Sequence, residues 1–354
     1  MLIYFYVSGH GFGHATRDIE VINTIAAGRP DVQFVVRTTV PNWLFIGRRI
    51  SAPVAVQSFE TDTGLVQIDS LRFDEHETAL RAAAFYRTFE QRVDAEARVL
   101  RSTGADLVVG DIPPVAFAAA ERAGVKSIAL GNFTWDWIYR VYPAFDALAP
   151  DVLPTIRAAY ATATRALRLP FNGGFEPMSA VTRDIPLIAR RSQRDRQDTR
   201  RQLGITDDRL LVLACFGAYG APLHTNPSRG ADGFTLLTVD RDPPAGLAYQ
   251  DVVAAADVVV SKPGYGIVSE CIANDTALLY TSRGRFIEYD RFVAEMPRML
   301  RCQFISQEDL FAGRWTDAIA ALLAQPAPVE RPPVNGADVA AADLLALAAG
   351  RPGG

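Results

Sequence analysis

The chain has 354 residues, of which 49% are hydrophobic, and a formal net charge of −4 at pH 7. Such a chain can bury a sizeable core but lacks the basic excess typical of nucleic-acid-binding proteins. Its three cysteines form no CxxC pair, which disfavours a disulfide framework or a thiolate zinc site. We find no signal peptide and no apolar run of about 18 residues, so we expect a cytoplasmic protein without a transmembrane helix.

The first half of the chain alternates strand-like and helix-like segments. Continuous apolar runs predict strands at 2–7, 31–38, 105–111 and 126–132. Helical spacing predicts helices at 15–28, 79–104 and 114–124. Strand and helix alternating in this way indicate βαβ units and a parallel sheet.

The second half repeats this pattern, with strands expected at 209–217, 233–240, 257–262, 277–282 and 302–306 and helices at 249–256, 267–275 and 314–325. The thirteen residues after Gly220 form a poor helix, so we expect a loop in place of a crossover helix. Gly and Pro residues predict a linker at 171–186. The expected domains are 1–170, 187–325 and a connector with a C-terminal helix at 326–354. This predicts an α/β protein with two doubly wound Rossmann-like domains facing across a cleft.

The stretch "SGHGFGH" follows the first strand and places Gly9, Gly11 and Gly13 before a helix. Glycines there let a ligand approach backbone N–H groups, and the positive end of the helix favours an anion. The pattern is not the GxGxxG dinucleotide fingerprint, and no acidic residue ends the second strand, which disfavours NAD. In the alternative interpretation the glycines serve only a tight turn.

Two histidines lie in this turn. His14, at the helix start, is expected to act as a general base, with Asp111 from the end of a neighbouring strand orienting it. The alternative role for Asp111 is to cap the following helix. His10 is either ligand-facing or structural. We also assign Arg17 to the acceptor side of the cleft, together with Gly11 and Gly13.

A second glycine turn, "KPGYGIVSE", is expected to hold a nucleotide diphosphate. Gly264, Tyr265 and Gly266 open a helix that can bind phosphates, and Glu270, about one turn later, can accept hydrogen bonds from a ribose diol. In the alternative interpretation Glu270 only stabilises the helix dipole. Lys262, one of two lysines in an arginine-rich chain, is assigned to the same site, as are Gly217 and Gly220 of a third turn.

The stretch "GNFTWDWIYRVY" at 131–142 is rich in aromatic residues. Aromatic faces suit sugars and other flat ligands, so we expect acceptor contacts from Trp135, Asp136 and Asn132. In the alternative interpretation this stretch is a buried aromatic cluster.

These motifs resemble those of GT-B glycosyltransferases of the MurG and UDP-glycosyltransferase kind. Over the whole chain, "GHGFGHATR", "ADLVVGDIPPVA", "GNFTWDWIY", "IPLIARR" and "NGADVAA" are similar to the glycosyltransferase-like N-terminal half of L-arabinokinases and stand-alone bacterial relatives. The resemblance implies that His14 is the base and that Asp111 orients it. It also implies donor contacts from Arg191, Gly217, Gly264, Gly266, Glu270 and Glu288. The pair Ile287-Glu288 departs from the superfamily, which leaves the donor sugar open.

The resemblance implies an inverting hexosyl- or pentosyltransferase. It would move a sugar from a nucleotide-diphosphate sugar, with UDP the expected carrier, to a hydroxyl-bearing acceptor without a metal or other cofactor. Because these residues contain no counterpart of the arabinokinase kinase half, sugar-kinase activity is not implied. A nucleotide-sugar 2-epimerase on the same fold and a non-catalytic nucleotide-sugar-binding module remain alternatives, and peripheral membrane contact stays open.

Overall fold

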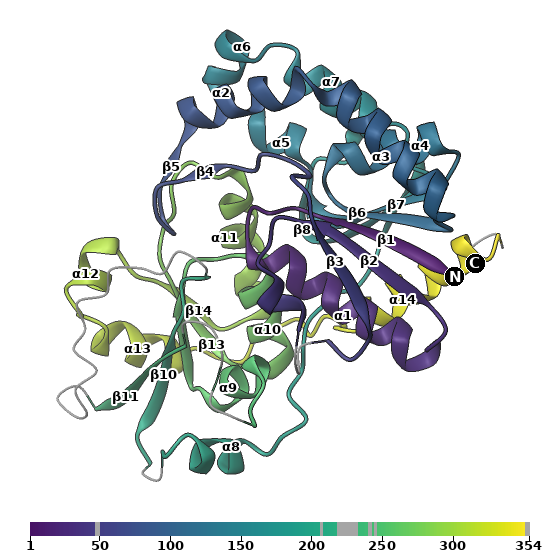
Figure 1. The fold of residues 1–354 in the computed structure, drawn as a ribbon. Helices are drawn as coiled ribbons and strands as arrows, with labels where there is room; N and C mark the ends of the chain where they lie inside the picture. The colour runs from purple at the N-terminus through teal and green to yellow at the C-terminus, as the bar shows by residue number, and fades with distance from the viewer. Residues whose placement is uncertain (47–49, 206–207, 218–232, 240–242, 244–245, 351–354) are drawn as a thin grey trace. The chain divides into compact units, whose positions relative to one another are not determined.

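The computed structural model describes residues 1–46, 50–205, 208–217, 233–239, 243 and 246–350. Within them the chain forms two compact units, each built on a parallel β-sheet with helices (Figure 1). The first unit contains Met1–Val66, Phe73–Ile188 and Asn335–Gly354, and the second contains Gln67–Arg72 and Ala189–Val334. The predicted α/β class with two parallel-sheet domains is therefore confirmed.

The first unit has a seven-stranded sheet in the order β3-β2-β1-β6-β7-β8-β9. Its strands are β1 (Leu2–Val7), β2 (Gln33–Thr38), β3 (Val54–Ser58), β6 (Leu107–Asp111), β7 (Ser127–Phe133), β8 (Arg165–Gly173) and β9 (Thr182–Asp184). All pairings between them are parallel. The register opposes Val7 to Asp111, so β1 and β6 end side by side at the carboxyl edge of the sheet.

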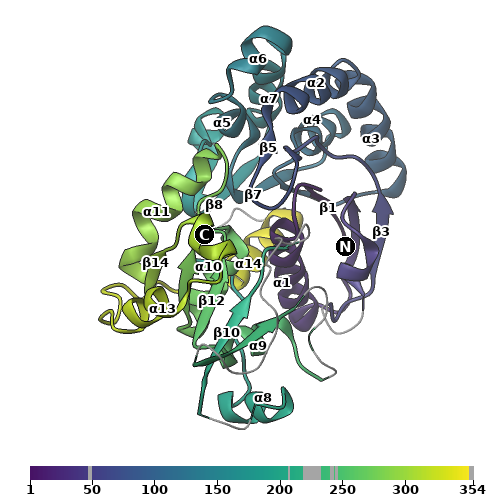
Figure 2. The same cartoon turned by 90° about the vertical axis from the view of Figure 1, so that its left-hand side faces the viewer.

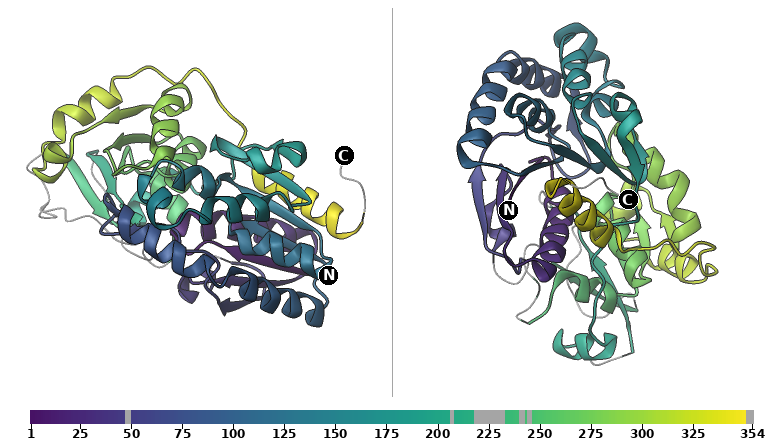
Figure 3. Two further views of the ribbon diagram at one scale, coloured as in Figure 1. Left: turned by 90° about the horizontal axis from the view of Figure 1, so that it is seen from above. Right: turned by 90° about the vertical axis from the view of Figure 1, so that its right-hand side faces the viewer.

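The helices of the first unit are α1 (Phe12–Gly28), α2 (Glu75–Tyr86), α3 (Phe89–Thr103), α4 (Pro114–Ala123), α5 (Trp135–Tyr139), α6 (Pro143–Leu148), α7 (Val152–Tyr160) and α14 (Gly336–Ala348). Short 3₁₀ helices lie at Asn42–Phe45 and Glu176–Val181. The C-terminal helix α14 packs alongside α1, as Figures 2 and 3 show. Its buried Asp343 accepts hydrogen bonds from Arg165, at 3.2 Å, and from Arg183.

The single helix predicted at 79–104 is wrong, because the chain breaks it into α2 and α3 at Arg87 and Thr88. The Thr88 hydroxyl donates a hydrogen bond to the carbonyl of Phe85 at 3.1 Å. Such a local side-chain bond competes with the helical backbone pattern. The aromatic rings of Tyr86 and Phe89 stack across the break, with their centroids 5.2 Å apart.

The linker predicted at 171–186 differs from the structure, in which these residues lie within the first unit as the end of β8, a 3₁₀ helix and β9. The two glycines that indicated a linker serve close packing instead. A Cβ atom on Gly173 would lie 2.2 Å from the Trp137 ring, and one on Gly174 would lie 2.0 Å from the Thr134 hydroxyl. After these residues the first unit continues to Ile188, and the second unit resumes at Ala189.

The second unit has a five-stranded parallel sheet in the order β11-β10-β12-β13-β14. Its strands are β10 (Leu210–Ala214), β11 (Phe234–Thr238), β12 (Val258–Ser261), β13 (Ala277–Tyr280) and β14 (Cys302–Phe304). Its helices are α8 (Arg196–Gln202), α9 (Tyr249–Ala255), α10 (Tyr265–Asn274), α11 (Ile287–Met299), α12 (Gln307–Phe311) and α13 (Thr316–Leu323). The loop expected after Gly220, and Gly220 itself, lie outside the described residues.

Candidate functional site

The first half of the candidate site lies where β1 ends and α1 begins. Gly11 is the N-cap of α1 in extended backbone, and a Cβ atom added to it would meet nothing within 4 Å. The helix begins at Phe12, three residues earlier than expected, so Gly13 and His14 lie in its first turn. Packing therefore does not require a glycine at position 11, and the N–H groups of a helix N-terminus suit an anionic ligand.

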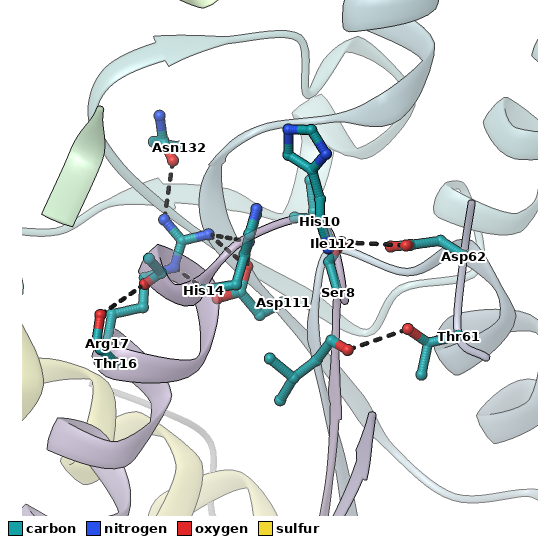
Figure 4. Close-up of polar contacts among 12 residues, drawn as sticks. Ser8, His10, His14, Thr16, Arg17, Thr61, Asp62, Asp111, Ile112 and Asn132 are labelled. Carbon is teal, nitrogen blue, oxygen red and sulfur yellow. Dashed lines mark hydrogen bonds and ion pairs between the residues drawn. The ribbon is translucent and has the colours of Figure 1, made fainter. Parts of the chain in front are cut away.

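His14 lies against Asp111, with its Nδ1 2.8 Å from the Asp111 Oδ1 (Figure 4). Both side chains are buried: His14 is 7% exposed and Asp111 is fully enclosed. The helix after Asp111 has Pro113 as its N-cap and no side-chain cap, so the structure favours the His14 partnership over the capping role. The predicted contact is present, while the catalytic role of the pair stays a prediction.

Arg17, one turn after His14, also binds Asp111. Its Nε donates to the Asp111 Oδ2 at 2.6 Å, its Nη2 donates to the Oδ1, and its Nη1 donates to Asn132 at 2.8 Å. Burial alone would raise the pKa of Asp111, but the Arg17 guanidinium and His14 outweigh burial and lower it to about 2. Asp111 is therefore a carboxylate at neutral pH, held by two partners from one helix.

The two partners of Asp111 favour opposite tautomers of His14. A carboxylate only accepts hydrogen bonds, so the 2.8 Å contact with Asp111 requires the imidazole proton on Nδ1. The Arg17 Nη2 lies 3.0 Å from the same Nδ1, and a hydrogen bond there requires that nitrogen to accept. Only one of these hydrogen bonds can exist at a time. A proton on Nδ1 leaves the Nε2 lone pair available as a base.

Sequence reasoning missed Asp18, which follows Arg17 on α1 and is fully buried. Burial and then the negative charge of Asp111 raise the pKa of Asp18 well above its ordinary value. The protonated form of Asp18 is thereby favoured, which leaves Asp111 as the anion that faces Arg17 and His14. Its position four residues after His14 on a helix was a usable sequence signal, because such residues share one face.

Sequence reasoning also missed Ser8 and Asp62, which lie beside His14 and Asp111. The Ser8 hydroxyl donates to the Asp62 Oδ1 at 3.1 Å, and the Trp135 Nε1 donates to the Oδ2 at 2.9 Å. Burial raises the pKa of Asp62 to about 6, despite these two hydrogen bonds. His10 is held by the backbone N–H of Leu65, which donates to its Nδ1 at 3.2 Å.

The aromatic stretch lies in the packed interior, as in the alternative interpretation. Trp135 is fully buried and stacks on Tyr139, with ring centroids 5.3 Å apart. Asp136 is 3% exposed and accepts a hydrogen bond from Arg157 at 2.8 Å. The acceptor contacts expected from Trp135 and Asp136 stay predictions, and the observed environment of both side chains is structural.

The second half of the candidate site lies at the start of α10. Gly264 is the N-cap in extended backbone, and a Cβ atom there would also meet nothing within 4 Å. Tyr265 and Gly266 form the first helical positions, as the glycine turn predicts. Gly217, after β10, has a positive φ of 74° and open space around its Cβ position.

Glu270, the predicted ribose ligand, is 4% exposed and held by Arg190, whose Nε donates to it at 2.7 Å. Burial raises the pKa of Glu270, and Arg190 opposes that rise. The Arg190 contact was not predicted, while the assignment of the exposed Arg191 to the donor diphosphate stays a prediction. Asn274 fixes this segment by donating to the Arg190 carbonyl at 3.0 Å.

Three charged side chains gather at the ends of β12 and β13. Lys262 follows β12, while Arg283 and Glu288 follow β13, with Arg283 4.0 Å from Glu288 and both nearly buried. Burial and then Arg283 lower the pKa of Lys262 to about 7, which Glu288 partly offsets. Two cations beside one carboxylate suit an anionic ligand. Arg283 was not predicted.

In the part of the chain that the structure describes, no cluster of three or more His, Cys, Asp or Glu side chains is arranged to hold a metal ion. No helix within those residues has the length and apolar character needed to cross a bilayer.

The chain is similar to one curated protein over almost its full length. The L-arabinokinase of Arabidopsis thaliana is 31% identical over 373 aligned residues, which cover 99% of this chain and 35% of that protein. The chain thus spans about a third of the curated relative it matches. No protein-family model matches the chain.

Solved structures with the same fold include MurG of Acinetobacter baumannii, with a TM-score of 0.52, 12% identity and coverage of 97% of this chain and 99% of that one. Phytolacca americana UGT2, complexed with UDP-2fluoro-glucose and pterostilbene, has a TM-score of 0.58 and 12% identity. The match covers 97% of this chain and 93% of that one. A UDP-N-acetylglucosamine 2-epimerase candidate from Listeria monocytogenes has a TM-score of 0.55 and 10% identity. The match covers 100% of this chain and 98% of that one.

The chain therefore has the GT-B fold of these solved structures. Its sequence is similar to the part of the plant L-arabinokinase that the alignment spans.

We predict that Gly110→Ala destabilises the first unit more than Gly11→Ala. A Cβ atom on Gly110 would lie 2.5 Å from the buried Phe117 ring, and overpacking of this kind lowers the free energy of unfolding by about 1–3 kcal/mol. Gly11 has open space, so an alanine there changes stability by less than about 1 kcal/mol. Urea denaturation of the two variants checks this order, and equal losses would contradict it.

We also predict that Asp18→Asn removes a pH dependence of stability. Because folding raises the Asp18 pKa, the wild type gains stability from this group below the unfolded pKa and loses it as pH rises toward the folded pKa. In that window the free energy of unfolding of wild type should fall, relative to the variant, by about 1.4 kcal/mol per pH unit. Parallel profiles from urea denaturation between pH 5 and 8 would show that Asp18 is ionised in the folded protein.

Proposed function

We propose that this protein is an inverting glycosyltransferase that moves a sugar from a nucleotide-diphosphate sugar, with UDP as the carrier, to an acceptor hydroxyl. The observation that carries the proposal is the buried 2.8 Å contact between His14 and Asp111 beside the open N-terminus of α1. A histidine oriented by a carboxylate is the arrangement that removes a proton from an attacking hydroxyl.

The proposed reaction is a direct displacement at the anomeric carbon. The His14 Nε2 takes the proton of the acceptor hydroxyl as its oxygen forms the new bond to that carbon. The bond between the anomeric carbon and the phosphate oxygen breaks, and the leaving diphosphate keeps the electron pair. Asp111 stabilises the imidazolium that forms, because its carboxylate faces the Nδ1–H.

The second half-site supports a nucleoside diphosphate as the leaving group. The N-terminus of α10 offers backbone N–H groups after Gly264, and Lys262 adds a cation two residues earlier. Both stabilise negative charge that grows on a leaving diphosphate. Glu270, oriented by Arg190, offers acceptor oxygens for ribose hydroxyls.

Two solved structures of the same fold support a nucleotide-diphosphate sugar as the donor class. UGT2 was solved with UDP-2fluoro-glucose, and another structure of the same fold, the glycosyltransferase VinC, was solved with dTDP. A 2-epimerase candidate also has a similar fold, so the alternative reaction is isomerisation of the donor sugar in place of its transfer to an acceptor. The His14–Asp111 pair favours transfer, because an epimerase needs no base for an acceptor hydroxyl.

We predict that nucleotide-diphosphate sugars raise the melting temperature of the protein. A ligand that binds only the folded state stabilises it in proportion to the logarithm of concentration over Kd, by about 2.7 kcal/mol at a hundredfold excess over Kd. A thermal-shift panel of UDP, GDP and dTDP sugars, with the free sugars as controls, should show the largest shift for a UDP conjugate. No shift from any conjugate would contradict the proposed function.

We predict that His14→Ala abolishes transfer while donor binding is retained. Loss of a general base lowers the rate about 10²- to 10⁴-fold. The matched control is His76→Ala, since His76 is exposed on α2 and should leave turnover unchanged. Turnover of the wild type without an acceptor would instead indicate an epimerase, and undiminished turnover in His14→Ala would exclude His14 as the base.

A further inference from the structure

Six residues from the N-terminal part of the sequence belong to the second unit. The chain leaves the first unit after Val66, contributes Gln67–Arg72 to the second unit, and returns to the first at Phe73. The short strands β4 (Val66–Gln67) and β5 (Phe73–Asp74) pair on either side of this turn. We call residues 67–72 the inserted turn.

The inserted turn is packed into the second unit. Its Leu71 is 4% exposed and lies in the hydrophobic core cluster that contains Phe216 and Leu279. The buried hydroxyl of Ser70 donates to the carbonyl of Phe216 at 2.7 Å, and the N–H of Gly284 donates to the carbonyl of Leu71 at 2.6 Å. A segment fixed by core packing and by hydrogen bonds to two loops is a built-in part of this unit.

A third hydrogen bond joins the inserted turn to the candidate donor site. The Lys262 ammonium donates to the carbonyl of Ser70 at 2.7 Å. Lys262 lies two residues before Gly264, the N-cap of α10. Burial and then Arg283 lower the pKa of Lys262 to about 7, whereas Glu288 and Asp69, the latter in the inserted turn, partly offset this.

The partner of Lys262 is a carbonyl and not a carboxylate, which has a chemical consequence. An ammonium has three N–H donors, and the Ser70 carbonyl accepts one of them. A neutral carbonyl fixes the direction of the ammonium without cancelling its charge. When Lys262 is protonated, two of its N–H donors are thus left for an anion near the start of α10.

We propose that the inserted turn, through Ser70 and Leu71, positions the Lys262 ammonium for the diphosphate of the donor. Ser70 and Leu71 are positioning residues in this proposal, because they act through Lys262. The proposal rests on the proposed function for the identity of the anion. The geometry of the inserted turn and Lys262 can be tested without any nucleotide.

The first test is amine labelling of the folded protein, read by peptide mass spectrometry. The chain has two lysines, Lys126 and Lys262, so Lys126 serves as an internal reference. Ser70→Ala removes the bond to Phe216 and Leu71→Ala removes the core anchor. Loss of an anchor should raise the labelling rate of Lys262 relative to Lys126 up to about tenfold. Ile68→Ala, on the same turn but 57% exposed, is the matched control and should leave the ratio unchanged.

The second test is donor affinity, measured by calorimetry with UDP and a UDP sugar at pH 6, where Lys262 carries its proton. Ser70→Ala and Leu71→Ala should weaken Kd up to about tenfold and raise the donor KM with kcat little changed. Ile68→Ala should bind as the wild type does. If Leu71→Ala does not fold, Ser70→Ala, which removes one hydroxyl, still decides the result.

The outcomes separate the two proposals. If the wild type binds no nucleotide conjugate, the proposed function fails, and labelling still decides whether the inserted turn holds Lys262. Labelling of Lys262 that is unchanged in both Ser70→Ala and Leu71→Ala overturns the positioning role. Undiminished donor affinity in both variants, with a wild type that binds, overturns it as well.

Discussion

The first half-site depends on one buried carboxylate with two partners. Asp111 ends β6 beside the end of β1, and α1 presents both His14 and Arg17 to it. The Arg17 guanidinium keeps Asp111 ionised in a buried position, which burial alone would oppose. The same guanidinium competes for the Nδ1 of His14. The arrangement thus secures the charge of the orienting carboxylate, and the tautomer of His14 depends on which contact is formed.

The two units share a feature at the carboxyl edge of their parallel sheets. In each, a helix has a glycine as its N-cap, Gly11 for α1 and Gly264 for α10, and the space around the Cβ position of that glycine is open. The charged side chains of the two half-sites differ. The first half-site places an ionised acid beside a histidine, and the second places two cations beside Glu288. In the proposed reaction the first takes up a proton, and the second accepts the charge of the leaving diphosphate.

Much of the fold could be predicted from sequence, because parallel strands are continuous apolar runs and their helices follow a regular spacing. The contact of His14 with Asp111 could also be predicted, since His14 starts the helix that follows β1 and Asp111 ends the neighbouring strand β6. Local patterns could not show that Arg190 binds Glu270, 80 residues away. Nor could they show that Ser70 lies against Lys262, 192 residues away, because such a contact depends on tertiary packing.

In the proposed mechanism Asp111, and not Arg17, sets the proton position on His14. Nitrogen-15 NMR of the imidazoles, with His14→Ala to assign the signal among the four histidines, measures that tautomer directly at a pH where the ring is neutral. We expect a proton on Nδ1 and an unprotonated Nε2. A proton on Nε2 would mean that Nδ1 accepts from Arg17, and His14 could not then act as the base proposed here.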